Sequence, residues 1–145
     1  MYLNGENVEN QIRTMEVSGN VSRVAEVSEV RAKLVEQQQD FGKEKGIVMD
    51  GRDIGTVVFP NAELKIFMNA SMETKAQRRF DELMAKGQEV TFDEVLKNVQ
   101  ERDYIDTHRK DSPLLKATDA IEIDNSNLNR EEQFQIVLDL VNQKM

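Results

Sequence analysis

The sequence contains no cysteine and only one histidine, His108, among its 145 residues. Disulfides and thiolate metal sites are therefore excluded, and neither a histidine-based metal centre nor a Ser-His triad is expected. No apolar run approaches membrane-spanning length, and the N-terminal residues lack the charged and apolar regions of a signal peptide. We therefore expect a cytoplasmic protein with no membrane partner and no metal-ligating residues.

A glycine-rich Gly-x-x-x-x-Gly-Lys-Ser/Thr loop is also absent, so the sequence offers no phosphate cradle of that kind. The net charge of −8 argues against a general grip on a nucleic acid backbone, although the unevenly placed arginines allow a local cationic pocket. Hydrophobic residues make up 39% and charged residues 32% of the chain. That balance fits one soluble domain with a highly charged surface and a core of useful size.

Spacing of apolar residues and capping residues predict the helices. The predicted helices cover residues 8–13, 21–42, 72–86, a stretch from 92 onward and a last one from near 129. Ser71 precedes the helix at 72–86, and Gly87 ends it. Thr91 and Glu94 form a capping box at the start of the next helix.

Short apolar runs predict three buried strands at residues 46–49, 64–68 and 120–124, and residues 14–17 read as an edge strand. Strands that alternate with helices indicate parallel pairing through right-handed crossovers. Parallel sheets are normally covered on both faces, and three strands are few. The chain therefore looks incomplete.

Asp50, Arg52 and Asp53 follow the predicted strand at 46–49, and strand ends are where α/β sheets place ligand chemistry. A guanidinium beside a carboxylate suits a ligand that carries both a phosphate and a base with an amino group. Taken alone, the segment is interpreted equally well as a polar turn, because Asp-Gly is a common turn dipeptide.

Arg102, Asp106 and Arg109 share one face if their segment is helical. The simpler interpretation is a solvated face with intrahelical ion pairs, each contributing roughly 0.2–0.5 kcal/mol. The functional alternative is that the arginines bind phosphate while the carboxylate accepts from sugar hydroxyls. Surface charge or capping is also the simpler interpretation for four further polar residues: Ser22, Arg31, Arg78 and Arg79.

In order and spacing these segments resemble the bacterial cytidylate kinases, a family of the P-loop nucleoside monophosphate kinase group. The most specific match is the string Asp-Gly-Arg-Asp-x-Gly-Thr-Val-Val-Phe-Pro at residues 50–60. Further matches are Val-Ser-Arg-Val-Ala at 21–25, Ala-Gln-Arg-Arg at 76–79 and Arg-Asp-x-x-Asp-x-x-Arg at 102–109. The resemblance implies a partial three-layer P-loop kinase-like α/β fold, with a small parallel sheet flanked by helices.

The resemblance also implies a division of the chain. Residues 1–45 would end the monophosphate-binding region, 46–77 would form core strands and a helix, 78–111 the lid, and 112–145 a core strand and the C-terminal helix. The family begins with a strand and a P-loop that this sequence lacks. We therefore expect a C-terminal piece of such a kinase, inactive on its own.

By the same resemblance, Ser22, Arg31 and Asp53 would read cytosine, and Arg52 would clamp the α-phosphate together with Arg109. The sugar contacts would be Arg102 and Asp106, and Arg78 would reach the ATP phosphates when the lid closes. The implied reaction transfers the γ-phosphate of ATP to CMP or dCMP. ATP with Mg²⁺ would serve the full-length enzyme, and this chain alone would hold no cofactor.

Three alternatives remain open at this point. The chain could be a non-catalytic module that binds pyrimidine nucleotides, or a fragment that forms homodimers through core surface left exposed. It could also belong to a kinase that accepts UMP as well as CMP. The sequence decides neither the preference between CMP and dCMP nor the oligomeric state.

Overall fold

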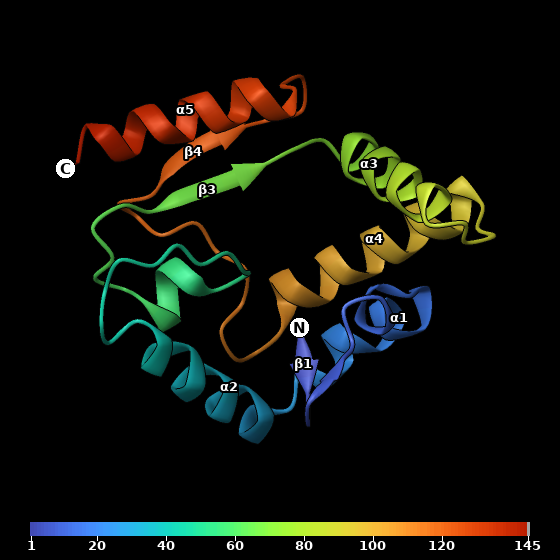
Figure 1. Cartoon of the computed structure of the whole chain (residues 1–145), viewed down its shortest axis with the longest axis horizontal. Helices are drawn as coiled ribbons and strands as arrows, with labels where there is room; N and C mark the ends of the chain where they lie inside the picture. Colours follow the sequence, from blue (N-terminus) through green and yellow to red (C-terminus); the bar gives the residue numbers. More distant parts are fainter. Residues whose placement is uncertain (145) are drawn as a thin grey trace.

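The computed structural model describes residues 1–144, which form α-helices and two small two-stranded sheets (Figure 1). The elements in chain order are β1 (Tyr2–Leu3), β2 (Glu6–Asn7), the 3₁₀ turn η1 (Gln11–Arg13), α1 (Met15–Val24), α2 (Ser28–Phe41), the π-helical turn η2 (Ile54–Val58), β3 (Ile66–Asn69), α3 (Met72–Ala85), α4 (Phe92–His108), β4 (Ile121–Asp124) and α5 (Arg130–Asn142). The expectation of an α/β fold with a small parallel sheet flanked by helices is confirmed.

Helices α1, α3 and α4 form what we call the helical unit. α3 packs against α4, and α1 packs against another side of α4 (Figure 1). Leu83 and Val95 are fully buried there, and the rings of Phe80 and Phe92 meet edge to face at 6.0 Å. Ser71 caps α3, and the predicted capping box of Thr91 and Glu94 is present at the start of α4.

Three predictions about the first 42 residues are wrong. Residues 14–17 are not an edge strand, because the Thr14 side chain accepts a hydrogen bond from the Val17 backbone and caps α1. The single helix expected over 21–42 is two helices, because Val27 has an extended backbone that turns the chain. The helix expected over 8–13 is reduced to the 3₁₀ turn η1.

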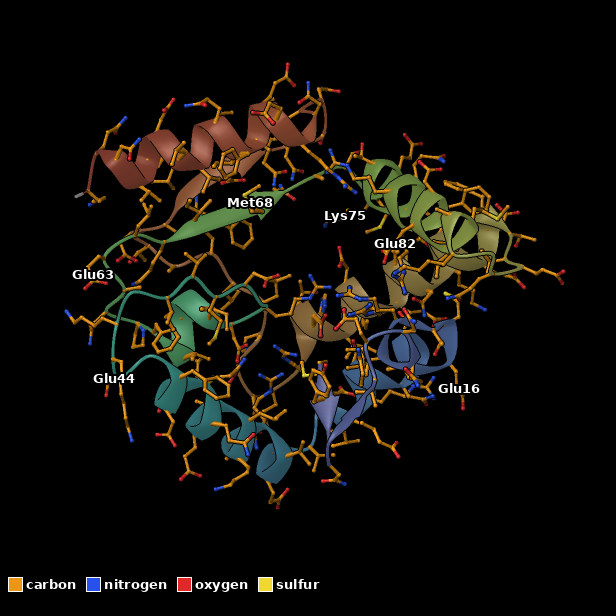
Figure 2. The ribbon with its side chains drawn as sticks, viewed as in Figure 1. Glu16, Glu44, Glu63, Met68, Lys75 and Glu82 are labelled. Atoms are coloured by element: carbon orange, nitrogen blue, oxygen red, sulfur yellow. The ribbon has the colours of Figure 1, made fainter. Side chains whose placement is uncertain are left out.

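Strands β3 and β4 pair in parallel, with Ile66 opposite Ile121, and together with α5 they form what we call the sheet unit. The Asn125 side chain after β4 donates to the Gln133 side chain of α5 at 2.6 Å, which ties this helix to the strand. The last helix begins where expected, and Asn129 caps it by accepting from the Glu132 backbone. Figure 2 shows Met68 on β3, at the exposed surface of this unit.

The strand predicted at 46–49 is wrong. Ile47 is 43% and Val48 97% exposed, and no described strand pairs with this segment. A parallel strand is held by hydrogen bonds to its neighbours, so an apolar run alone does not form one. The sheet therefore has two parallel strands in place of the expected three.

Turn η2 packs against α2 and fixes the polar residues just before it. A side chain at Gly42 would collide with the Phe59 ring, since an added Cβ would lie 2.6 Å from its Cζ. Glycine thus permits the close approach of η2 to the end of α2. The Asp53 carbonyl starts the turn by accepting from the Val57 backbone at 2.9 Å.

Candidate functional site

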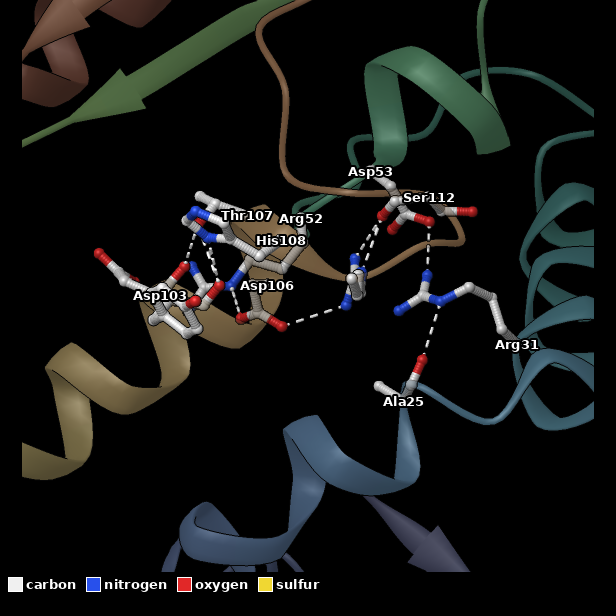
Figure 3. A network of polar contacts seen from close by, with 11 residues as sticks. Ala25, Arg31, Arg52, Asp53, Asp103, Asp106, Thr107, His108 and Ser112 are labelled. Atoms are coloured by element: carbon white, nitrogen blue, oxygen red, sulfur yellow. Dashed lines mark hydrogen bonds and ion pairs between the residues drawn. The ribbon is translucent and has the colours of Figure 1, made fainter.

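A buried ion pair joins α2 to the residue before η2. Arg31 Nη1 donates to Asp53 Oδ2 at 2.6 Å, with side chains only 12% and 8% exposed (Figure 3). Arg31 Nε also donates to the Ala25 carbonyl, which lies at the break between α1 and α2. The break that the sequence analysis missed therefore orients Arg31 toward Asp53.

A second carboxylate, Asp106 on α4, holds two arginines. Its Oδ2 accepts from Arg52 Nε at 2.9 Å, and its Oδ1 accepts from Arg109 Nη1 at 3.1 Å. Arg109 is held further by the Ser112 carbonyl, which accepts from its Nε at 2.9 Å and its Nη2 at 2.7 Å. Arg52 keeps 43% of its side chain exposed. The cluster therefore consists of a buried ion pair, Asp106 with Arg109, and one cation that solvent can reach.

These two groups lie together, and their charges act on one another. Burial lowers the pKa of the Arg109 guanidinium, and the nearby charge of Arg31 lowers it further. Burial is also the main cause that lowers the pKa of Arg102, followed by the charge of Arg52. Neighbouring positive charges repel one another, and a bound anion would offset this repulsion. The arrangement is suited to a phosphate.

Arg102 occupies a different position from the other arginines. Its Nη1 donates to Ser18 Oγ on α1 at 3.0 Å, and its buried Nε has no hydrogen-bond partner in the described chain. Ser22, one turn along α1 from Ser18, is 4% exposed. The structure thus gathers Arg31, Arg52, Asp53, Asp106 and Arg109, with Arg102 beside them and Ser22 buried on α1.

Arg78 is not part of this cluster. Its Nη1 donates to Asn125 Oδ1 at 3.0 Å, and its Nη2 donates to the carbonyls of Asn125 and Leu128 at 2.6 and 3.2 Å. These contacts tie α3 to the loop after β4. Its assignment to ATP phosphates stays a prediction.

Two charged residues at the site were missed by the sequence analysis. Lys75 on α3 (Figure 2) donates to Asp103 Oδ2 at 2.7 Å, and Asp103 Oδ1 lies 3.9 Å from Arg52 Nη2. Asp103 precedes Asp106 by three residues on one helix face, which was a usable signal. Lys75 had none, because it is 28 residues from its partner.

The sequence also matches proteins of one known family. Residues 1–143 match the sequence model of the cytidylate kinase family. The chain belongs to the cytidylate kinase family. It is 78% identical over 142 residues to the cytidylate kinase of Flavobacterium johnsoniae, with 98% of this chain and 62% of that protein covered.

Two further relatives give the same result. Identity is 74% over 142 residues to the cytidylate kinase of Flavobacterium psychrophilum, covering 98% of this chain and 63% of that protein. It is 66% over 132 residues to that of Bacteroides thetaiotaomicron, covering 91% and 58%. The chain thus spans about three fifths of the length of the curated relatives it matches.

Two kinds of feature are absent from the described residues. Residues 1–144 include no helix both long and apolar enough to cross a bilayer. Over the same residues, no three or more acidic or histidine side chains gather where they could hold a metal ion.

Proposed function

We propose that the protein containing this chain transfers the γ-phosphate of ATP to CMP or dCMP, and that this chain supplies the pocket for the monophosphate. The observation that carries the proposal is the juxtaposition of the buried Arg31–Asp53 pair with the Arg52–Asp106–Arg109 cluster. The name cytidylate kinase, which the relatives carry, agrees with it.

Base recognition falls to Asp53 and Arg31 in this proposal, with Ser22 nearby on α1. A carboxylate accepts from the exocyclic amino group of cytosine, and a guanidinium donates to its ring acceptors. Uracil has a carbonyl where cytosine has the amino group, so the Asp53 carboxylate would face another acceptor. The proposal therefore favours CMP over UMP.

Phosphate recognition falls to Arg52 and Arg109, and the sugar to Arg102 and Asp106. Phosphoryl transfer asks the protein mainly for positioning and charge neutralisation. An oxygen of the CMP phosphate attacks the γ-phosphorus of ATP, the bond to the β-phosphate oxygen breaks, and ADP leaves. Closure of residues 78–111, with Arg78 reaching the ATP phosphates, would exclude water.

The sequence offers no motif to hold the ATP phosphates and their Mg²⁺. We therefore propose that the 145-residue chain alone binds CMP but does not transfer phosphate at a useful rate. An assay that couples ADP release to a colour change tests this. Normal turnover by the purified chain would contradict it.

Calorimetric titration of CMP, with UMP as the control ligand, tests the pocket itself. We expect binding of CMP that is selective over UMP and is lost in Asp53→Asn, which removes the charge but keeps the size. Equal binding of UMP would favour a kinase of broad pyrimidine preference. Binding of CMP unchanged in Asp53→Asn would contradict the assignment of the base site.

Self-association is the second candidate function. Phe134 on α5 is 59% exposed, and Ile136 and Leu138 are each more than one third exposed. Phe134 and Leu138 are four residues apart and share one face of α5, and an exposed apolar face is a common site of association. Light scattering decides, because a clean monomer at high concentration would contradict homodimer formation through this surface.

A further inference from the structure

Arg102 is held in a way that distinguishes it from its neighbours. Arg31, Arg52 and Arg109 each form an ion pair with a carboxylate, whereas the hydrogen bond of Arg102 within the described chain goes to the neutral hydroxyl of Ser18. The Nε of Arg102 is buried without a partner. A buried donor without an acceptor is costly, and it leaves the Ser18 hydroxyl as the group that holds the Arg102 guanidinium in the described chain.

Ser18 is itself oriented by a third residue. Its hydroxyl donates to Asn98 Oδ1 at 2.9 Å, which leaves the oxygen lone pairs of Ser18 to accept from Arg102 Nη1 at 3.0 Å. Asn98 and Arg102 are four residues apart on α4, while Ser18 lies on α1. The three side chains form a relay that leaves α4, passes through α1 and returns to α4.

Burial makes the relay specific. Ser18 is 5% exposed, so water is poorly placed to replace its hydroxyl. Loss of that hydroxyl would leave the Arg102 guanidinium with no hydrogen bond to the described residues. Because Ser18 is 80 residues from Asn98 and 84 from Arg102 in the sequence, no local pattern pointed to either contact.

We infer that Ser18 and Asn98 are positioning residues that hold the Arg102 guanidinium where it contacts the bound nucleotide. The inference rests on the proposed function, in which Arg102 contacts the sugar. Asn98 fixes the direction of the Ser18 hydroxyl, and Ser18 fixes Arg102. The relay also makes the sugar contact depend on how α1 packs against α4.

Kinetics of the full natural protein that contains this sequence test the relay with CMP and dCMP. Ser18→Ala is expected to raise KM about tenfold with kcat changed less than about threefold, since a hydrogen bond to a charged group is lost from nucleotide binding. Ser18→Thr keeps the hydroxyl and should restore KM. Asn20→Ala on the same helix, where the exposed side chain donates to the Glu16 carbonyl, is the matched control.

A second readout does not depend on the reaction. The Arg102 Nε–H resonance, assigned through Arg102→Lys, is recorded in the nucleotide-free protein. It should shift or broaden in Ser18→Ala and, to a lesser degree, in Asn98→Ala, but not in Asn20→Ala. Asn98→Ala also serves if Ser18→Ala does not fold.

The outcomes are distinct. An unchanged resonance in Ser18→Ala overturns the inference whatever happens to KM, because an effect on KM would then not run through Arg102. A changed resonance with an unchanged KM overturns it as well. If the wild-type protein binds neither CMP nor dCMP, the proposed function fails, and the resonance alone decides whether Ser18 positions Arg102.

Discussion

The helical unit and the sheet unit differ in how completely they bury their apolar side chains. In the helical unit Ala76, Leu83 and Val95 are completely buried. Among the described residues of the sheet unit, Ile123 is the one buried apolar side chain, and Phe134 remains 59% exposed. The helical unit thus has a closed apolar centre, although Val24 (53%) and Met84 (50%) are exposed at its surface, whereas the sheet unit has a single buried apolar side chain among its described residues.

This contrast bears on where function lies. Arg102 and Asp106 are on α4 of the helical unit, and their partners come from α1, from the segment before η2 and from the end of α4 itself. The ion pairs that join Arg31 to Asp53 and Asp106 to its two arginines are therefore all formed within this chain. The chain spans about three fifths of its relatives' length. We expect the nucleotide site to depend less than the sheet unit does on contacts with residues outside this chain.

The largest expected effect comes from removing a buried carboxylate of the helical unit. Asp106→Ala leaves Arg109, only 2% exposed, without its carboxylate, and should lower the free energy of unfolding by about 3–5 kcal/mol. Urea unfolding followed by circular dichroism measures it. Asp103→Ala is the control, because Asp103 is 18% exposed and should cost far less. Equal losses would contradict the distinction.

The next prediction compares the two units directly. Leu83→Ala opens a cavity in the helical unit and should cost about 2–5 kcal/mol. Phe134→Ala removes a larger side chain that is already mostly in water, so less than about 1 kcal/mol is expected. The same urea titration measures both. A Phe134→Ala loss as large as that of Leu83→Ala would mean that α5 is covered in solution, for example by a second copy.

A smaller effect is expected from Arg31→Lys. Lysine keeps the charge but not the planar fork that reaches both Asp53 and the Ala25 carbonyl. The Kd for CMP should rise about tenfold, or roughly 1.4 kcal/mol, by calorimetry. Lys116→Arg, an exchange of the same two residue types at an exposed side chain paired with Glu122 on β4, is the control and should leave the Kd unchanged. No loss in Arg31→Lys would remove Arg31 from the base site.

The smallest effect concerns the pH dependence of stability through Glu94. Hydrogen bonds from Thr91 lower the pKa of the Glu94 carboxyl below its ordinary 4.5. Its stabilising contribution is therefore complete above pH 4.5 and is lost as pH falls through the lowered pKa of the folded state. Glu94→Gln keeps an oxygen acceptor for the capping box, so the urea midpoint should fall less between pH 5 and 3 than in the wild-type chain. Equal slopes would contradict this.

Local features of the fold could be predicted from the sequence. Ser71, Thr91 with Glu94, and Asn129 each cap a helix through residues three positions away, so the signal lies within one turn. Parallel pairing of the later two strands followed from the intervening helices. The face shared by Asp106 and Arg109 also followed from spacing, and the structure joins them in an ion pair.

Features that depend on distant partners could not be predicted in this way. Residues 46–49 have the composition of a buried strand but lack a neighbouring strand in the described chain. Ser18 carries no signal of its own, because its contacts to Asn98 and Arg102 cross from one helix to another. The pairing of Arg31 with Asp53 depends on a break between helices that apolar spacing conceals.

The central claim is that a pyrimidine nucleoside monophosphate binds between the Arg31–Asp53 pair and the Arg52–Asp106–Arg109 cluster. A crystal structure of the CMP complex tests it most directly. The account predicts the cytosine amino group within about 3.2 Å of an Asp53 carboxylate oxygen, and phosphate oxygens at the same range from the guanidiniums of Arg52 and Arg109. CMP bound with its base away from Asp53 and its phosphate away from both arginines would contradict it.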